Sequence, residues 1–289
     1  MIHPAGVRSS AVAELVKPSQ TLLLMVTAYC SYLAAGGRSP LNLVILTVSE
    51  VLAISGTTAA NMYLERDIDA LMPRTSRRPL PSGSISPGYA VALASSMFLV
   101  SVIISSIWSG ALTLTILVGF LSDILVYTNI VKRMTPYSVV LGGIAGAMPA
   151  LGGWVLARGF TPAGFLLAAV VLAWIPMHIW FIATYYADDY ALAGIPMMPV
   201  IRGPSEAARY TEYSTASIPA LAWAYYAITR RGLLAAVVAT ALAALALRRA
   251  EDFRRSPTRD AAREMFKMAS PLIAVVFVLE ALEGVLGIP

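Results

Sequence analysis

Nine stretches of this chain are long and apolar enough to cross a lipid bilayer. Roughly 20 apolar residues in a helix span the hydrocarbon core, and these runs are too continuous for the alternating pattern of a membrane β-barrel. Within lipid, a single span must satisfy its own backbone hydrogen bonds, so we expect helices. The sequence predicts an all-α membrane bundle of about nine transmembrane helices, forming one domain over residues 1–289. The spans lie near residues 20–35, 42–60, 89–107, 110–127, 138–156, 162–187, 212–229, 232–247 and 270–287.

The composition agrees with a chain that is buried in lipid. Apolar residues make up 58% of it and charged residues 13%, which is about half the charged share of a soluble domain. The single cysteine, Cys30, lies inside an apolar span, so no intrachain disulfide can form and the thiol has a packing role. The chain is basic, but membrane topology accounts for the lysines and arginines, and we expect no nucleic-acid partner.

The basic residues also predict an orientation, because lysine and arginine are retained in short cytoplasmic loops. With nine spans, most of the 21 lysines and arginines fall on the side of the N-terminus. Arg38, Arg158 and the pair 230–231 are the exceptions. We therefore expect a multi-pass protein of the cell membrane with a cytoplasmic N-terminus, and we expect segment 61–83 on the same side.

Segment 61–83, NMYLERDIDALMPRTSRRPLPSG, concentrates acids and arginines next to an apolar span. Asn61, Glu65 and Asp69 are spaced four apart and fan across roughly 80° of one helical face, whereas Asp67 points elsewhere. Acidic residues at a membrane edge indicate function when they cluster on one side. The alternative is a solvated helix end whose acids pair with the neighbouring arginines.

A second acidic segment, 174–203, ends another long apolar span on the same predicted side. His178, Tyr185 and Asp189 fall within about 40° of one another on a continuous helix, while Asp188 lies roughly 100° from Asp189. Asp189 is therefore the better candidate to face inward.

Two sets of carboxylates at one end of a helical bundle suit Mg²⁺, which favours a few carboxylates completed by substrate phosphates. Arginines beside them could bind the remaining phosphate charge. The pattern therefore favours a membrane enzyme that acts on a lipid diphosphate. A secondary transporter is an alternative, although transporter sites favour the bilayer midplane. A purely structural subunit would leave the two acidic segments unexplained.

Segment 61–83 resembles the first acidic motif of the UbiA superfamily of intramembrane prenyltransferases, and in particular its protoheme IX farnesyltransferase branch. The similarity continues through residues 127–154 and 176–203, and more weakly through 15–28. Ser19, Glu65 and Asp188 depart from the branch pattern. The residues that match the first motif are Asn61, Glu65, Asp69, Met72, Arg74, Thr75, Arg78, Pro79 and Leu80.

The resemblance implies transfer of a farnesyl group from farnesyl diphosphate to a vinyl group of heme b, which gives heme O, with an active site at the cytoplasmic edge. It also implies roles for individual residues. Those implied to hold Mg²⁺ are Asn61, Glu65, Asp69 and Asp189. Those implied to bind phosphate or heme propionates are Arg74, Arg78, Lys132 and Arg133. Those implied to steady an allylic cation or to contact heme are Tyr127, Tyr185 and His178.

Several of these roles have structural alternatives. Lys132 and Arg133 could serve only as topology markers, Tyr127 and Tyr185 could be interfacial tyrosines, and His178 could be a packed histidine. The acceptor is also open at this point. Another member of the superfamily would prenylate an aromatic acid, a quinone precursor or a glycerol ether lipid.

Overall fold

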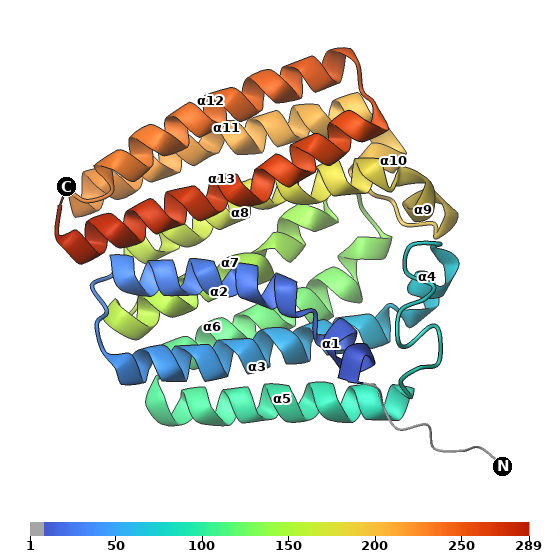
Figure 1. Ribbon diagram of the computed structural model, residues 1–289, viewed down its shortest axis with the longest axis horizontal. Coiled ribbons are helices and arrows are strands. Elements are labelled where there is room, and N and C mark those ends of the chain that lie inside the picture. The colour runs from blue at the N-terminus through green and yellow to red at the C-terminus, as the bar shows by residue number, and fades with distance from the viewer. Residues whose placement is uncertain (1–8, 289) are drawn as a thin grey trace.

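The computed structural model describes residues 9–288 and is a helical bundle without strands over that range (Figure 1). The long elements are α2 (Pro18–Ala34), α3 (Pro40–Leu64), α5 (Pro87–Trp108), α6 (Gly110–Leu121) with its π-helical continuation η1 (Ser122–Thr128), α7 (Ser138–Arg158), α8 (Pro162–Tyr185), α11 (Pro204–Thr229), α12 (Leu233–Arg255) and α13 (Arg259–Leu286). The short elements are α1 (Ser9–Val16), α4 (Arg66–Leu71), η2 (Val131–Arg133), α9 (Ala187–Leu192) and α10 (Met198–Arg202).

The starts of the long helices follow from local sequence. Pro40 and Pro87 occupy the first helical positions of α3 and α5, where the missing N–H would have no partner within the helix. The preceding serines act as N-caps, because the side chains of Ser39 and Ser86 accept hydrogen bonds from backbone N–H groups three residues ahead, each at 3.3 Å. These signals separate consecutive spans sharply.

The prediction of an all-α multi-pass membrane protein is confirmed. Seven elements of the described chain have the length and composition of a membrane span, and α2 and α11 bring the long elements to the expected number. Two helices begin earlier than the apolar runs indicate, since α11 starts at Pro204 and α13 at Arg259. Their first turns are polar and carry the helices beyond the apolar segment.

The short elements gather at one end of the bundle. In Figure 1, α1, α4, α9 and α10 lie toward the right, and the C-terminus lies at the opposite end. This arrangement follows from the alternation of helix direction, because α3 and α8 end where α2, α5, α7 and α13 begin. Both acidic segments therefore lie at the same end of the molecule.

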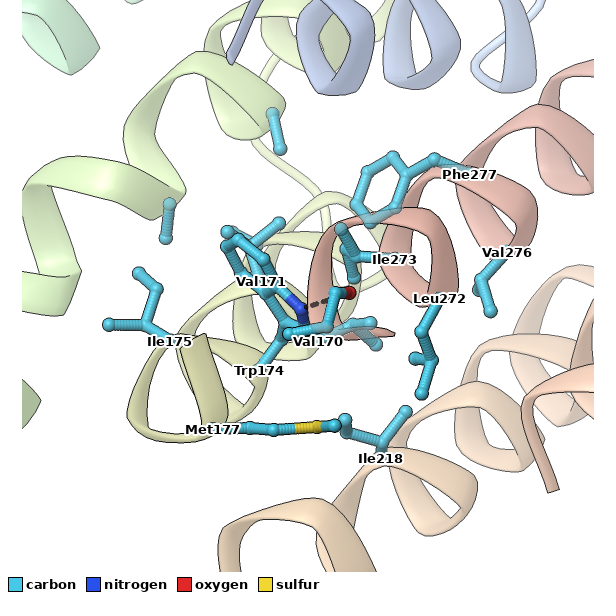
Figure 2. Close-up of a cluster of buried hydrophobic side chains, with 14 of the residues drawn as sticks. Val170, Val171, Trp174, Ile175, Met177, Ile218, Leu272, Ile273, Val276 and Phe277 are labelled. Carbon is cyan, nitrogen blue, oxygen red and sulfur yellow. Dashed lines mark hydrogen bonds between the residues drawn. The ribbon is translucent and has the colours of Figure 1, made fainter. Parts of the chain in front are cut away.

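A buried cluster between α8, α11 and α13 fixes one side of the bundle (Figure 2). Trp174 of α8 lies in this cluster with Ile273 and Phe277 of α13, and Met177 of α8 lies beside Ile218 of α11. The Trp174 indole N–H donates to the carbonyl of Ala269 at 2.7 Å. Glycines allow close approach elsewhere. This packing holds α8 in a fixed rotation beside the cavity described below.

Gly153 illustrates such an approach between α2 and α7. A Cβ atom at this position would lie 1.9 Å from the carbonyl oxygen of Ala28, so only glycine allows the two helices to pack at this distance. Gly142 serves a related purpose, because a Cβ atom there would lie 2.5 Å from the ring of Tyr127. Gly142 therefore makes room for a tyrosine that lines the cavity.

Candidate active site

A cavity of about 570 Å³ lies among α2, α3, α6 with η1, α7 and α8. Most of its charged lining comes from the ends of these helices at the side of α4 and α9, and its interior lining is largely apolar. The sequence-predicted site residues that line it are Asn61, Glu65, Asp69, Arg74, Arg78, Tyr127, Lys132 and His178. Those that do not line it are Arg133, Tyr185 and Asp189.

The first acidic segment reaches the cavity across a break between two helices. The helix α3 ends at Leu64, and α4 begins after Glu65. Backbone hydrogen bonds continue through the junction, from the N–H of Glu65 to the carbonyl of Asn61 at 2.9 Å and from the N–H of Asp69 to the carbonyl of Glu65 at 2.8 Å. Asn61, Glu65 and Asp69 therefore stay on one helical face, as their four-residue spacing predicts, and all three line the cavity.

Each buried carboxylate of this segment pairs with one basic residue. Arg78 Nη1 donates to both carboxylate oxygens of Asp69 at 2.8 Å, and Asp69 is only 1% exposed. Lys132 Nζ pairs with Glu65 Oε1. The Thr75 hydroxyl donates to the backbone carbonyl of Asp69 at 2.9 Å, which ties the loop after α4 back to the acid. At the mouth of the cavity, the negative charges of Glu65 and Asp69 are therefore each compensated by one basic side chain.

Lys132 and Arg133 are neighbours in sequence but point to different places. Arg133 forms a bidentate pair with Asp67 at 3.0 Å, and both side chains are about half exposed or more. Lys132 points into the cavity, with Nζ 5.4 Å from the centre of the Tyr127 ring. Arg133 with Asp67 therefore forms a surface pair outside the cavity.

The π-helical segment η1 supplies a second wall. Single π-helical turns are frequent at functional sites, and here the segment carries Asp123 and Tyr127, both of which line the cavity. Thr128 at its end accepts a hydrogen bond from the side-chain amide of Asn61 at 2.7 Å. This bond fixes the Asn61 side chain with its carbonyl oxygen free to act as a ligand.

The second acidic segment contacts the mouth of the cavity through Arg74. The helical conformation is interrupted at Tyr186, so α8 and α9 are separate helices. Asp189 of α9 accepts a hydrogen bond from the backbone N–H of Arg74 at 3.3 Å, and its carboxylate lies 3.8 Å from Arg74 Nε. The Arg74 guanidinium lies 4.4 Å from the Tyr186 ring centre and donates to the Tyr190 hydroxyl at 3.4 Å. Asp189 thus positions Arg74, which lines the cavity.

Tyr185 does not join His178 in the cavity, although their helical phases agree. The backbone carbonyl of Tyr185 accepts a hydrogen bond from Arg259 Nε at 2.8 Å, and the Arg259 guanidinium lies 5.2 Å from the tyrosine ring centre. The residue lines a separate small cleft together with Asp188. The common face expected for His178, Tyr185 and Asp189 is lost because the helix breaks at Tyr186 and Arg259 holds Tyr185 at the outer edge.

His178 lies on the cavity wall between two aromatic side chains. Its ring centre is 4.8 Å from that of Trp174 and 4.7 Å from that of Phe266. Its Nδ1 atom is 3.4 Å from the Ser270 hydroxyl. Aromatic stacking therefore fixes the plane of the imidazole beside the cavity.

Three ionisable residues that sequence reasoning did not assign to the site also line the cavity: Lys17, Glu50 and Asp123. Lys17 lies between α1 and α2 with a positive φ of 46°. Burial lowers the pKa of Lys17 to about 8, and the nearby positive charge of Arg78 acts in the same direction. Asp123 forms no ion pair within the described residues. The signal for Asp123 was present, since it is a lone acid inside an apolar span.

The donor set suits a metal ion that arrives with a phosphate. Within residues 9–288 no three His, Cys, Asp or Glu side chains are grouped closely enough to hold a metal by themselves. Asn61, Glu65 and Asp69 nevertheless line one cavity and offer the oxygen ligands that Mg²⁺ prefers. Mg²⁺ is commonly held by one or two carboxylates together with substrate phosphates. The residues therefore fit Mg²⁺ bound jointly with a diphosphate.

Comparison with known proteins identifies the class and then the family. Residues 23–271 match the UbiA prenyltransferase family. The chain is 45% identical to the protoheme IX farnesyltransferase of Archaeoglobus fulgidus, with 92% of this chain and 95% of the relative covered. It is 43% identical to the protoheme IX farnesyltransferase of Aeropyrum pernix, with 98% and 96% covered. The chain is thus an integral membrane prenyltransferase. It belongs to the UbiA prenyltransferase family.

Solved structures share the fold at low sequence identity. One reported for digeranylgeranylglyceryl phosphate synthase has a TM-score of 0.78 at 14% identity, with 96% of this chain and 98% of that chain covered. The structure of a UbiA homolog from Aeropyrum pernix K1 has a TM-score of 0.74 at 20% identity, with 91% of this chain and 97% of that chain covered. The structure of a UbiA homolog from Archaeoglobus fulgidus bound to DMAPP and Mg²⁺ has a TM-score of 0.73 at 15% identity, with 95% of this chain and 98% of that chain covered. Family membership sets aside the transporter and structural-subunit alternatives.

Proposed function

We propose that this protein transfers a farnesyl group from farnesyl diphosphate to a vinyl group of heme b and so produces heme O. The observation that carries the proposal is a cavity with a charged mouth and an apolar interior, in a chain that matches two protoheme IX farnesyltransferases over nearly its whole length. The diphosphate would bind at the mouth, and the prenyl chain would lie in the interior. The whole chain, residues 1–289, acts as one integral membrane domain.

The reaction breaks the allylic C–O bond, and its electron pair leaves with the diphosphate. The vinyl group supplies the electrons for the new C–C bond, and water adds to the resulting carbocation with loss of a proton. Asn61, Glu65 and Asp69 would hold Mg²⁺ with the diphosphate, with Asp189 supporting the site through Arg74. The metal, when bound, stabilises negative charge on the leaving group.

The existing ion pairs explain how the site accepts an anion. Lys132 and Arg78 compensate Glu65 and Asp69. Glu65 and Asp69 would serve as ligands to Mg²⁺ when it is bound with the diphosphate, and Lys132 and Arg78 would then be available to bind phosphate oxygens. Charge-assisted bonds of this kind are among the stronger hydrogen bonds in proteins. The site therefore stays close to charge balance before and after substrate binds.

Two aromatic features of the cavity suit the later steps. Tyr127 lies on the cavity wall beneath Lys132 and offers a ring face to an allylic cation. His178 is held between Trp174 and Phe266, and its Nδ1 atom faces Ser270. The other imidazole nitrogen is then the one available to heme iron. Arg74, which lines the cavity, would pair with a heme propionate. Arg133 lies outside the cavity and would reach a propionate only by leaving Asp67.

We propose a cytoplasmic N-terminus in the cell membrane, with the cavity mouth on the same side. The short helices α1, α4, α9 and α10 gather at that end (Figure 1), and α4 and α9 carry acidic residues in their first turns. The basic residues beside the mouth include Lys132, Arg133 and those of the loop after α4. Such a concentration is typical of the cytoplasmic side.

Purified protein in detergent tests the proposal directly. Incubation with heme b, farnesyl diphosphate and Mg²⁺ should give heme O, identified by its mass, and removal of divalent cations with EDTA should stop the reaction until Mg²⁺ is restored. His178→Ala should alter the Soret band of added heme b. Consumption of farnesyl diphosphate with an aromatic acid or a glycerol ether, but not with heme, would refute the proposed acceptor.

A further inference from the structure

Glu50 is a buried acid at the inner end of the cavity, far from the charged mouth. It lies in α3 and is 3% exposed. The residues of α3 that line the cavity form one stripe along the helix: Glu50, Ala53, Ile54, Thr57, Thr58 and Asn61, with Glu65 just beyond its end. Because α3 runs toward the mouth, Glu50 is the innermost member of this stripe.

The surroundings of Glu50 do not explain its presence as a structural contact. Its Oε1 atom is fully buried and has no hydrogen-bond partner, and the acid forms no ion pair with any residue from 9 to 288. The neighbouring Thr115 hydroxyl donates instead to the carbonyl of Leu112 at 2.8 Å. An unpartnered polar group in an apolar interior is costly. Ionisable residues at membrane depth therefore point to a function.

A glycine on the facing helix α7 makes room for this acid. A Cβ atom at Gly152 would lie 2.4 Å from Glu50 Oε1 and 3.2 Å from the Thr115 hydroxyl oxygen. Glu50 and Thr115 also line the cavity together with Pro149, which is the α7 residue of the lining that lies farthest from the mouth. These three side chains close the inner end of the cavity, and Glu50 and Thr115 give that end its polar atoms.

The depth of this floor matches a particular prenyl length. Asn61 and Glu50 are eleven residues apart, which corresponds to about 16 Å along the helix at a rise of 1.5 Å per residue. An extended isoprene unit has four chain bonds and advances roughly 5 Å, given carbon–carbon bonds of about 1.5 Å. Three units therefore reach about 15 Å and four reach about 20 Å by the same estimate.

We infer that Glu50, backed by Thr115 and Gly152, is the floor that selects a three-unit prenyl diphosphate against longer ones. The inference rests on the proposed function for the position of the diphosphate at the Asn61 end of the cavity. A farnesyl chain would end at the floor, and the fourth unit of a geranylgeranyl chain would have to displace the carboxyl group. Glu50 is thus a specificity-determining residue that stays clear of the reacting atoms.

Competition binding of C15 and C20 prenyl thiolodiphosphates with Mg²⁺ tests this inference without any acceptor. The wild-type protein should prefer C15 by about tenfold or more, and Glu50→Ala should bring the preference to within about threefold by opening the floor. Glu50→Gln, which keeps size and polarity, should retain it. Glu280→Ala is the matched control, since Glu280 is an equally buried acid with an unpartnered oxygen that does not line the cavity.

The outcomes separate this inference from the proposed function. If Glu50→Ala keeps the wild-type preference while it still binds C15 analogue, or if the wild type shows no preference, the floor is refuted even when heme O forms. If Glu50→Ala reduces the preference for the C15 analogue but heme is not prenylated, the role of Glu50 in chain-length selection is supported and the proposed acceptor is refuted. Should Glu50→Ala not fold, Gly152→Ala provides the second variant. It should push Glu50 into the cavity and weaken C15 binding more than binding of the C10 analogue, and equal weakening would contradict the inference.

Discussion

Two arginines of this protein each donate to both carboxylate oxygens of an aspartate but lie at very different depths, and their removal should have very different effects. Arg78 holds both oxygens of Asp69 at 2.8 Å, with side-chain exposures of 21% and 2%. Arg133 holds both oxygens of Asp67 at 3.0 Å, with exposures of 46% and 61%. We expect Arg78→Met to destabilise the fold strongly and Arg133→Met to leave it nearly unchanged.

The magnitudes follow from burial. Removing one partner of a buried pair costs about 3–5 kcal/mol because the remaining charge is left without compensation. Since the Arg78 side chain is a fifth exposed, we expect Arg78→Met to lower the free energy of unfolding by about 3 kcal/mol, the lower end of this range. An exposed ion pair such as that of Arg133 contributes about 0.5 kcal/mol to the free energy of unfolding. At about 2 °C per kcal/mol for a chain of this size, Tm should fall by about 6 °C for Arg78→Met and by about 1 °C for Arg133→Met.

Thermal unfolding in one detergent, followed by tryptophan fluorescence without substrate or metal, measures both shifts. Adding Asp69→Asn to Arg78→Met removes the stranded charge and should restore most of the lost stability. Equal shifts for the two arginine variants, or no recovery in the double variant, would refute the reasoning that burial of Asp69 sets the effect. Activity is no guide here, because Asp69 and Arg78 both belong to the proposed site.

Two further predictions concern charges at the mouth of the cavity. Because burial lowers the pKa of Lys17 to about 8, the folded protein loses this positive charge as pH rises through about 8. The affinity of the wild-type protein for the C15 thiolodiphosphate should then fall by up to about tenfold per pH unit above that value. The Lys17→Arg variant should bind the analogue with little dependence on pH. Identical pH profiles for the two proteins would show that Lys17 does not contact the anion. Asp189→Ala should lower kcat/KM for prenyl diphosphate by roughly 10–100-fold, because Asp189 positions Arg74, while Asp188→Ala, whose side chain is 88% exposed, should stay near wild type. A larger loss for Asp188→Ala would contradict this arrangement.

The sequence by itself determined the fold class and the position of the acidic residues along it. Runs of apolar residues are a local property, and a span in lipid must be helical to satisfy its backbone, so the nine long elements could be located without tertiary information. The spacing of Asn61, Glu65 and Asp69 also predicted correctly that they share one helical face, because backbone hydrogen bonds continue through the break at Glu65.

Only the tertiary structure decided which side chains share the cavity. Lys132 turns inward and Arg133 turns to the surface, although both lie in the short helix η2. Tyr185 agrees in phase with His178 but is held outside by Arg259. These outcomes depend on partners from distant parts of the chain, which a helical wheel does not contain.

The same limit applies to Lys17, Asp123 and Glu50, which line the cavity without having been assigned to it from sequence. In a soluble helix, the contrast between apolar and polar faces shows which face is buried. In a membrane helix both lipid and protein interior are apolar, so the pattern of residues does not distinguish them. The rotation of each helix is set by close contacts such as that between Gly153 and the carbonyl of Ala28. Rotation turns Glu50 of α3 and Asp123 of η1 toward the cavity, whereas Lys17 reaches it from the residue before α2.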